Sequence, residues 1–206
     1  MSGKVYSLIF AGVGGQGALL GAEITALAAV RAGLDVKQTE VHGVSQRGGS
    51  VETHVRFGEK VWSPVVTPGA ADVVIGLEKL EALRFAHFVA PDGVILANDH
   101  EIIPGSIAGA EDQYPHDAID RLRGLAGRVV VLPAAEAARD LGDGRMANLV
   151  MVGGLAALLP IPRPTWIETI RERIPEKYRK ANLQAFEAGE ALMAQALGGL
   201  AERSTP

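Results

Sequence analysis

Short apolar runs alternate with longer stretches rich in alanine and leucine along the first part of the chain. Residues 5–11 form an apolar run that ends at Gly12 and predicts a strand, whereas residues 18–32 predict a helix that Gly33 closes. Residues 35–41 predict a second strand. The N-terminal part therefore has the pattern of a β-α-β unit, for which we expect a right-handed crossover.

A strict alternation of apolar and polar residues follows. Every second residue of 51–57 is a valine, threonine or phenylalanine, and the residues between them are polar or charged, which predicts a half-buried strand. The pair Gly58-Glu59 predicts a turn into a short partner at 60–62. We therefore expect a β-hairpin inserted into the sheet.

The middle of the chain repeats the alternation of strands and helices. Strands are predicted at 72–76, 94–98 and 128–132, and helices at 78–89, 117–126 and 134–141. Residues 144–159 predict a further helix that is apolar all round, so its own domain or another subunit must cover every side of it. This stretch is too short to span a bilayer.

The composition changes after Pro160. Residues 165–168, Thr-Trp-Ile-Glu, have the pattern of a capping box and predict the start of a charged amphipathic helix, which Pro175 separates from a last helix at 176–197. The whole pattern predicts an α/β fold, a doubly wound, Rossmann-like, mostly parallel sheet with a β-hairpin insertion and a C-terminal helical extension. We expect the α/β domain to comprise residues 1–160 and the extension residues 161–206.

Composition and charge narrow the class of protein. A net charge of -4 argues against a general affinity for nucleic acid or for an anionic membrane. The chain has no cysteine, so it cannot supply the thiolates that normally hold iron-sulfur clusters. Residues 1–4 lead directly into the first apolar run without the pattern of a signal peptide, and we expect a cytoplasmic protein.

The glycine-rich turn between the first strand and the first helix is one candidate site. A G-x-G-x-x-G pattern in this context brings backbone N–H groups close to an anion at the positive end of the helix. The candidate binding residues are Gly12, Gly14, Gly15, Gln16 and Gly17. Glu40 stands where a dinucleotide site has its ribose-binding acid. The alternative is that the glycines only pack helix against strand. A Walker A loop is excluded, because Ala-Leu follows Gly17.

A basic, glycine-rich segment follows the second strand, at the carboxyl end where open α/β sheets place their ligand crevice. Arg47 offers a planar fork of donors to a carboxylate or phosphate, and the glycines after it let backbone approach closely. The alternative is an exposed turn with one solvated arginine. The candidate residues of this segment are His42, Ser45, Gln46, Arg47, Gly48 and Gly49.

These two motifs, together with residues 50–58 and 71–78, resemble the beta subunits of indolepyruvate:ferredoxin oxidoreductases. More broadly, they resemble the gamma-type subunits of the 2-oxoacid:acceptor oxidoreductase family. Arg47-Gly48-Gly49 matches the Arg-Gly-Gly element of that family. Ser45-Gln46 matches the indolepyruvate variant instead of the Gly-Pro-Glu usual in the pyruvate enzymes. The resemblance in motifs is strong over residues 1–80 and weaker beyond them.

The resemblance implies a division of labour between subunits. In such enzymes thiamine diphosphate, held with Mg²⁺, attacks the 2-oxoacid, electrons pass through [4Fe-4S] clusters to ferredoxin, and the acyl group goes to coenzyme A. The indolepyruvate type carries thiamine and clusters in its large subunit. The resemblance therefore implies that this chain binds no cofactor alone, carries no catalytic residue and works in a heteromer. Its glycine motifs are then expected to line part of a substrate or coenzyme A channel.

Two alternatives stay open on the residues alone. The chain could be a stand-alone Rossmann module that binds NAD or FAD at 12–17, or a purely structural assembly subunit whose loops contact only protein. Its five histidines have no metal-site spacing, so no metal ligand is expected. Residues 106–114 allow no interpretation.

Overall fold

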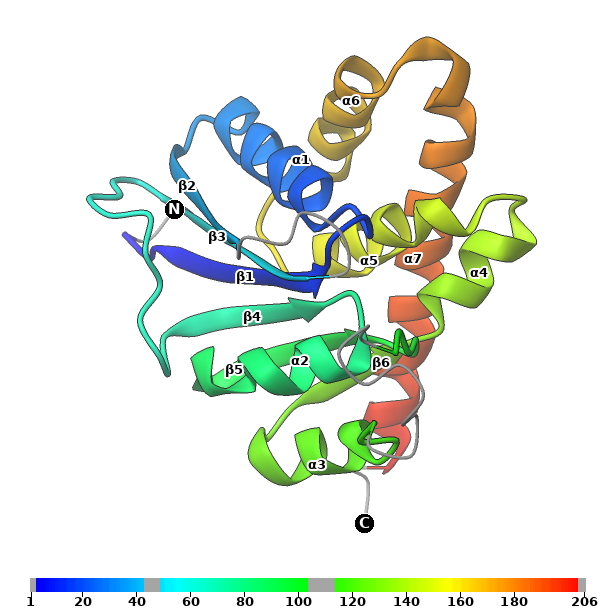
Figure 1. Ribbon diagram of the computed structural model, residues 1–206. Helices are drawn as coiled ribbons and strands as arrows, with labels where there is room; N and C mark the ends of the chain where they lie inside the picture. The colour runs from blue at the N-terminus through cyan, green and yellow to red at the C-terminus, as the bar shows by residue number, and fades with distance from the viewer. Residues whose placement is uncertain (1–2, 43–48, 104–113, 204–206) are drawn as a thin grey trace.

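The computed structural model describes residues 3–42, 49–103 and 114–203, and a six-stranded mixed sheet forms its centre (Figure 1). The strands are β1 (Tyr6–Val13), β2 (Asp35–His42), β3 (Ser50–Gly58), β4 (Ala71–Gly76), β5 (Val89–Asn98) and β6 (Val129–Leu132). They lie in the order β2-β3-β1-β4-β5-β6. The neighbours from β1 to β6 are parallel, and β3 runs antiparallel to β1 and β2. The predicted α/β class is confirmed.

Helices cover both faces of the sheet, as a doubly wound fold requires (Figure 1). They are α1 (Ala18–Arg31), α2 (Lys79–Phe85), α3 (Ala118–Leu125), α4 (Ala134–Asp140), α5 (Ala147–Ala156), α6 (Arg163–Arg173) and α7 (Glu176–Arg203), with short 3-10 turns at Ala86–Phe88 and Gly144–Met146. Side chains alternate along a strand, so Leu8 and Phe10 face α1, α5, α6 and α7, whereas Ile9 and Ala11 face α2 and α3. All four are fully buried, which explains why the first strand is apolar throughout.

The antiparallel strand β3 lies between β1 and β2. It pairs with β1 from Ser50 to Phe57 and with β2 from Val51 to Gly58, so the hairpin consists of β2 and β3. The strand predicted at 51–57 is confirmed, but the strand predicted at 60–62 is wrong. β1 and β2 run in the same direction, as the predicted β-α-β unit requires, but they are not neighbours.

Side chains of β3 explain why the segment after it does not pair as a strand. Arg56 donates from Nη1 to the carbonyl oxygens of Ser63 (3.0 Å) and Val65 (3.3 Å), and the backbone N–H of Val66 donates to Nδ1 of His54 (3.0 Å). These bonds hold the segment through side chains that project from the sheet face. The backbone of residues 63–66 is therefore held over the face of the sheet from which Arg56 and His54 project, and it does not pair with a strand.

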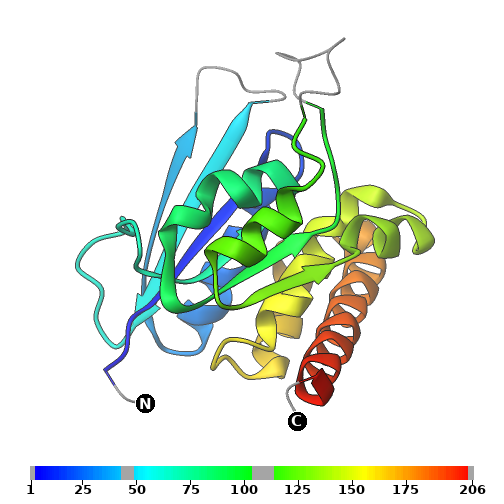
Figure 2. The same ribbon diagram turned by 90° about the horizontal axis from the view of Figure 1, so that it is seen from below.

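α5 and α7 cross at unusually short range beside the β6 edge of the sheet (Figure 2). An added Cβ at Gly153 would overlap the carbonyl oxygen of Phe186, and one at Gly189 would overlap the carbonyl oxygen of Val150. Residues 148–155 of α5 are all buried. The prediction that this apolar helix is covered on every side is thus confirmed, and much of the cover comes from α7.

The start of α6 differs from the prediction. The helix begins at Arg163, its N-cap is Pro162, and no side chain caps it, so the predicted capping box at Thr165 is wrong. Pro164 in the first turn favours the earlier start, because proline lacks only an N–H that would be unpaired there. The division into domains at residue 160 stays a prediction. Among the described helices none has both the length and the apolarity to cross a membrane.

Candidate functional site

The strand order places a crevice at the carboxyl ends of β1 and β4. From β1 the chain continues through α1 to the β2 side of the sheet, and from β4 it continues through α2 to the β5 side. Open α/β sheets bind their ligands where the strand order reverses in this way. The turn 12–17 lies at this point and begins with the last two residues of β1.

Gln16 ties the glycine turn to the neighbouring strand. Its Oε1 accepts from the backbone N–H of Val13 (2.8 Å), and its Nε2 donates to the carbonyl oxygen of Leu77 (2.9 Å), just beyond β4. The side-chain amide is thus engaged inside the fold. Gln16 was predicted as a binding residue, and here it sets the shape of the turn.

Two glycines of the turn have backbone conformations that favour glycine. Gly15 has φ 104° and Gly17 has φ 79°. Gly17 is the N-cap of α1, which has no side-chain cap and no acidic residue in its first turn. Within the described residues no side chain caps the positive end of α1, and binding of an anion there stays a prediction. Asn148 closes the turn from α5 and donates to the carbonyl oxygen of Gly17 (3.3 Å).

The two predicted motifs meet at this edge. The backbone N–H of Gly14 donates to the carbonyl oxygen of Gly49 (2.8 Å), and the next residue, Ser50, pairs with Val13 across β3 and β1. The strand end that follows the basic segment is thereby bonded to the glycine turn. Four predicted site residues and one side chain lie outside the described residues: Ser45, Gln46, Arg47, Gly48 and the side chain of His42.

Hollows surround the turn on both sides. One, of about 450 Å³, is lined by Gly14, Leu19, Glu40 and the Glu23–Arg173 ion pair, whose atoms are 2.7 Å apart. A second, of about 640 Å³, runs from Gly15 past α5 to the junction of α6 and α7. A third, of about 190 Å³, reaches the carboxyl end of β5. Glu40, proposed above for ribose binding, does lie in the same hollow as the turn.

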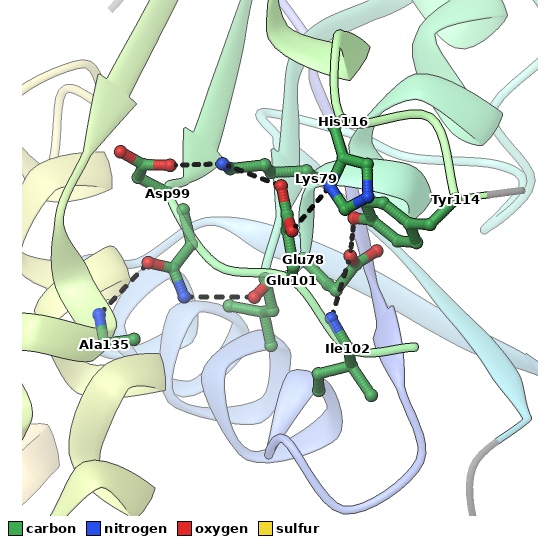
Figure 3. A network of polar contacts seen from close by, with 10 residues as sticks. Glu78, Lys79, Asp99, Glu101, Ile102, Tyr114, His116 and Ala135 are labelled. Carbon is green, nitrogen blue, oxygen red and sulfur yellow. Dashed lines mark hydrogen bonds and ion pairs between the residues drawn. The ribbon is translucent and has the colours of Figure 1, made fainter. Parts of the chain in front are cut away.

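A polar network that the sequence did not reveal lies beside the turn, at the start of α2 (Figure 3). Glu78 is the N-cap of α2, and its carboxylate accepts from the backbone N–H groups of Glu81 (2.9 Å) and Ile102 (3.2 Å) and from the hydroxyl of Tyr114. Burial and, less strongly, the hydrogen bond to Glu78 raise the pKa of the Tyr114 hydroxyl above its usual range. This phenol stays a donor.

Charged residues extend the network toward the surface. Lys79 Nζ lies 2.7 Å from Asp99 and 3.2 Å from Glu101, and Glu101 in turn contacts His116 (3.1 Å). The hydrogen bond to Asp99, opposed by desolvation, raises the pKa of Lys79. In the sequence, Asp99 and Glu101 look like solvated loop residues. The fold places the Lys79 ammonium between their two carboxylates.

Asn98 joins β5 to the same edge. Its Nδ2 donates to the carbonyl oxygen of Leu77 (3.0 Å), and its Oδ1 accepts from the backbone N–H of Ala135 (3.1 Å) at the start of α4. The carbonyl oxygen of Leu77 thus accepts hydrogen bonds from two side-chain amides, those of Gln16 and Asn98. One signal in the sequence was a polar residue at the end of each apolar run: Glu78 lies two residues after β4, and Asn98 is the last residue of β5.

Comparison with known proteins finds relatives that are named as oxidoreductases or as their subunits. The sequence profile described as "Pyruvate ferredoxin/flavodoxin oxidoreductase" matches residues 7–192. The chain is 41% identical over 187 residues to indolepyruvate oxidoreductase subunit IorB of Archaeoglobus fulgidus, a match that covers 89% of this chain and 92% of that protein. It is 35% identical over 202 residues to the subunit of the same name in Thermococcus kodakarensis, covering 95% and 99%.

Solved structures with the same fold include the gamma subunit of keto/oxoacid ferredoxin oxidoreductase from Geobacter sulfurreducens. It superposes with a TM-score of 0.68 at 22% identity, over 94% of this chain and 99% of that one. At this identity the likeness concerns the fold.

Proposed function

The chain belongs to the pyruvate ferredoxin/flavodoxin oxidoreductase family, and from this membership we propose that it is the small subunit of an indolepyruvate-type 2-oxoacid:ferredoxin oxidoreductase. The observation that carries the proposal is the similarity over almost the whole length to proteins named as indolepyruvate oxidoreductase subunits. The enzyme would decarboxylate an arylpyruvate oxidatively and form an acyl-coenzyme A. The chain by itself is expected to be inactive.

The iron-sulfur clusters of such an enzyme do not fit this chain. A [4Fe-4S] cluster is normally held by cysteine thiolates, and the sequence contains no cysteine. We therefore assign the clusters to a large partner subunit, with ferredoxin as acceptor of the complex. The resemblance described above implies that thiamine diphosphate and its Mg²⁺ are bound by the same subunit. A cytoplasmic location stays a prediction.

In this proposal the chain contributes a binding surface for an anionic substrate at the carboxyl ends of its strands. The open end of α1 and the root of the basic segment lie together through the Gly14–Gly49 hydrogen bond. Helix N-termini and arginine bind phosphates and carboxylates. Coenzyme A and a 2-oxoacid both carry such groups. We propose that this edge faces the partner's thiamine site and lines the path of coenzyme A.

A stand-alone dinucleotide-binding module is the second candidate. It is favoured by one observation, that Glu40 and the glycine turn line the same hollow. The Glu23–Arg173 ion pair lines the same hollow. Tight binding of NAD or FAD by the purified chain, abolished in Gly14→Val, would support this candidate over the first. The third candidate, a purely structural subunit, is tested by Arg47→Ala.

Copurification tests the proposal most directly. The chain should be isolated from its native source with its partner, and iron and thiamine should be measured on each separated subunit. We expect both in the large subunit, and arylpyruvate-dependent, coenzyme A-dependent acceptor reduction only in the complex. In that complex Arg47→Ala should raise the KM of an anionic substrate. Turnover by the isolated chain would contradict the proposal, and kinetic constants unchanged by Arg47→Ala would favour a purely structural role.

A further inference from the structure

The first turn of α2 carries two buried carboxylates to which the proposed function gives no role. The exposed fractions of Glu78 and Glu81 are 1% and 4%. Burying a carboxylate is costly unless hydrogen bonds satisfy it. The groups that satisfy these two carboxylates therefore show which parts of the fold the helix holds in place.

Glu81 holds the first residue of β3. Its Oε2 accepts from the hydroxyl of Ser50, and its Oε1 lies 3.3 Å from Nε of Arg84. Ser50 can reach α2 because the even-numbered side chains of β3 project from that face of the sheet, opposite to Val55 and Phe57. A hydroxyl on a strand is thus fixed by a carboxylate on a helix in the neighbouring layer.

The position of Ser50 gives this contact its significance. Ser50 directly follows Gly49, whose carbonyl oxygen accepts from Gly14 in the glycine turn. The strand end that carries the basic segment is therefore held at two points, by the turn through the backbone and by Glu81 through a side chain. The second point fixes the first residue of β3 against α2.

We propose that Glu81 is a positioning residue, which acts through Ser50 to set the root of the basic segment against the glycine turn. The proposal rests on the proposed function for its consequence in catalysis. Glu78 supports the same helix turn, because its carboxylate accepts from the backbone N–H of Glu81 and ties that turn to Tyr114. Neither carboxylate contacts substrate in this scheme.

The kinetic test compares Ser50→Ala, Glu81→Gln and the double variant in the complex with the large subunit. The matched control is Glu136→Gln, which makes the same change at an exposed first-turn glutamate of α4. Each single variant should lower kcat/KM for coenzyme A or the 2-oxoacid about tenfold, mainly by raising KM, since one hydrogen bond to a charged group is lost. The double variant should fall no further, because both changes remove the same contact.

Hydrogen exchange supplies a readout that needs no activity. The backbone N–H of Gly14 donates to the carbonyl oxygen of Gly49, and its exchange rate in the isolated chain should rise about tenfold in Ser50→Ala and in Glu81→Gln, as expected for a lost bond of this strength. It should stay at the wild-type value in Glu136→Gln. Ser50→Ala is the milder change, so it separates positioning from misfolding if Glu81→Gln melts early.

The two readouts separate the two hypotheses. Wild-type kinetic constants together with a wild-type exchange rate at Gly14 in Ser50→Ala would overturn the positioning role. Additive losses in the double variant would overturn it as well. If the wild-type complex shows no coenzyme A-dependent oxidation of any 2-oxoacid, the proposed function fails, and the exchange rate at Gly14 still decides whether Glu81 positions the start of β3.

Discussion

Replacing Gly153 by alanine tests how closely α5 and α7 cross. The new Cβ would overlap the carbonyl oxygen of Phe186 and lie 2.9 Å from the carbonyl carbon of that residue and 3.1 Å from the backbone nitrogen of Glu190. The overlap with the oxygen is the closest of these contacts, and favourable carbon contacts lie at about 3.5–4.0 Å, so α7 would have to move by roughly 1.5 Å. All three of these atoms belong to backbone, so no rotamer change relieves the contact.

The magnitude follows from two opposing effects. Overpacking a buried site costs about 1–3 kcal/mol, and the rigid backbone of α7 places Gly153→Ala at the upper end of this range. Alanine offsets about 1 kcal/mol of this through its better helix propensity. We expect a net loss of about 2 kcal/mol in the free energy of unfolding, which lowers Tm by about 4–8 °C in a chain of this size.

Gly154→Ala is the matched control, one residue along the same helix. There the nearest atom, 2.6 Å from the added Cβ, is Cδ1 of Leu132, the end of a flexible side chain, so we expect a change close to zero. Gly124→Ala in α3 meets nothing within 4 Å and should stabilise the chain by about 0.5–1 kcal/mol. Urea unfolding followed by circular dichroism measures all three. Equal stabilities of the two α5 variants would refute the account of the helix crossing.

Three further predictions concern the crevice and its surroundings. Gly17→Ala forces a left-handed φ on alanine and moves Asn148, and unfolding in urea should show a loss of about 2 kcal/mol. Asn98→Ala leaves the carbonyl of Leu77 and the N–H of Ala135 without this partner and should cost about 2–3 kcal/mol in the same assay. Burial raises the pKa of Glu81, with Ser50 and Arg84 opposing and Glu78 adding to the shift, so the folded chain binds that proton more tightly than the unfolded one. Stability should therefore fall as pH rises through this raised pKa, and Glu81→Gln should flatten the fall; an identical pH dependence in the variant would contradict the assignment.

Local sequence patterns predicted where the strands and helices lie better than they predicted which strands pair in the sheet. The alternation at 51–57 identified β3 because one face of it packs on α1, but alternation does not say which strand lies alongside. Its pairing with β1 joins residues far apart in the sequence, and no turn signal reports that. At α6 two local signals competed, and Pro164 in the first turn outweighed the capping-box pattern at Thr165.

The candidate site divides in the same way. The glycine turn was predictable, since only a few residue types adopt the backbone that Gly15 and Gly17 require. The network around Glu78 was not, because its members come from α2, from the end of β5 and from Tyr114, and each alone reads as a cap or a solvated side chain. Tertiary structure brings them together.

The insertion of β3 between β1 and β2 also dictates an order of assembly. Among the described strands β2 pairs with β3 alone, so β2 has no strand to join until residues 50–58 have left the ribosome, and it becomes part of the larger sheet when β3 pairs with β1. Pairing strands that are distant in sequence is slow and leaves edges open in the meantime. During synthesis, the N-terminal β-α-β segment therefore stays unfinished for longer than its compact sequence suggests, and this interval is when a chaperone or a partner subunit would have access to it.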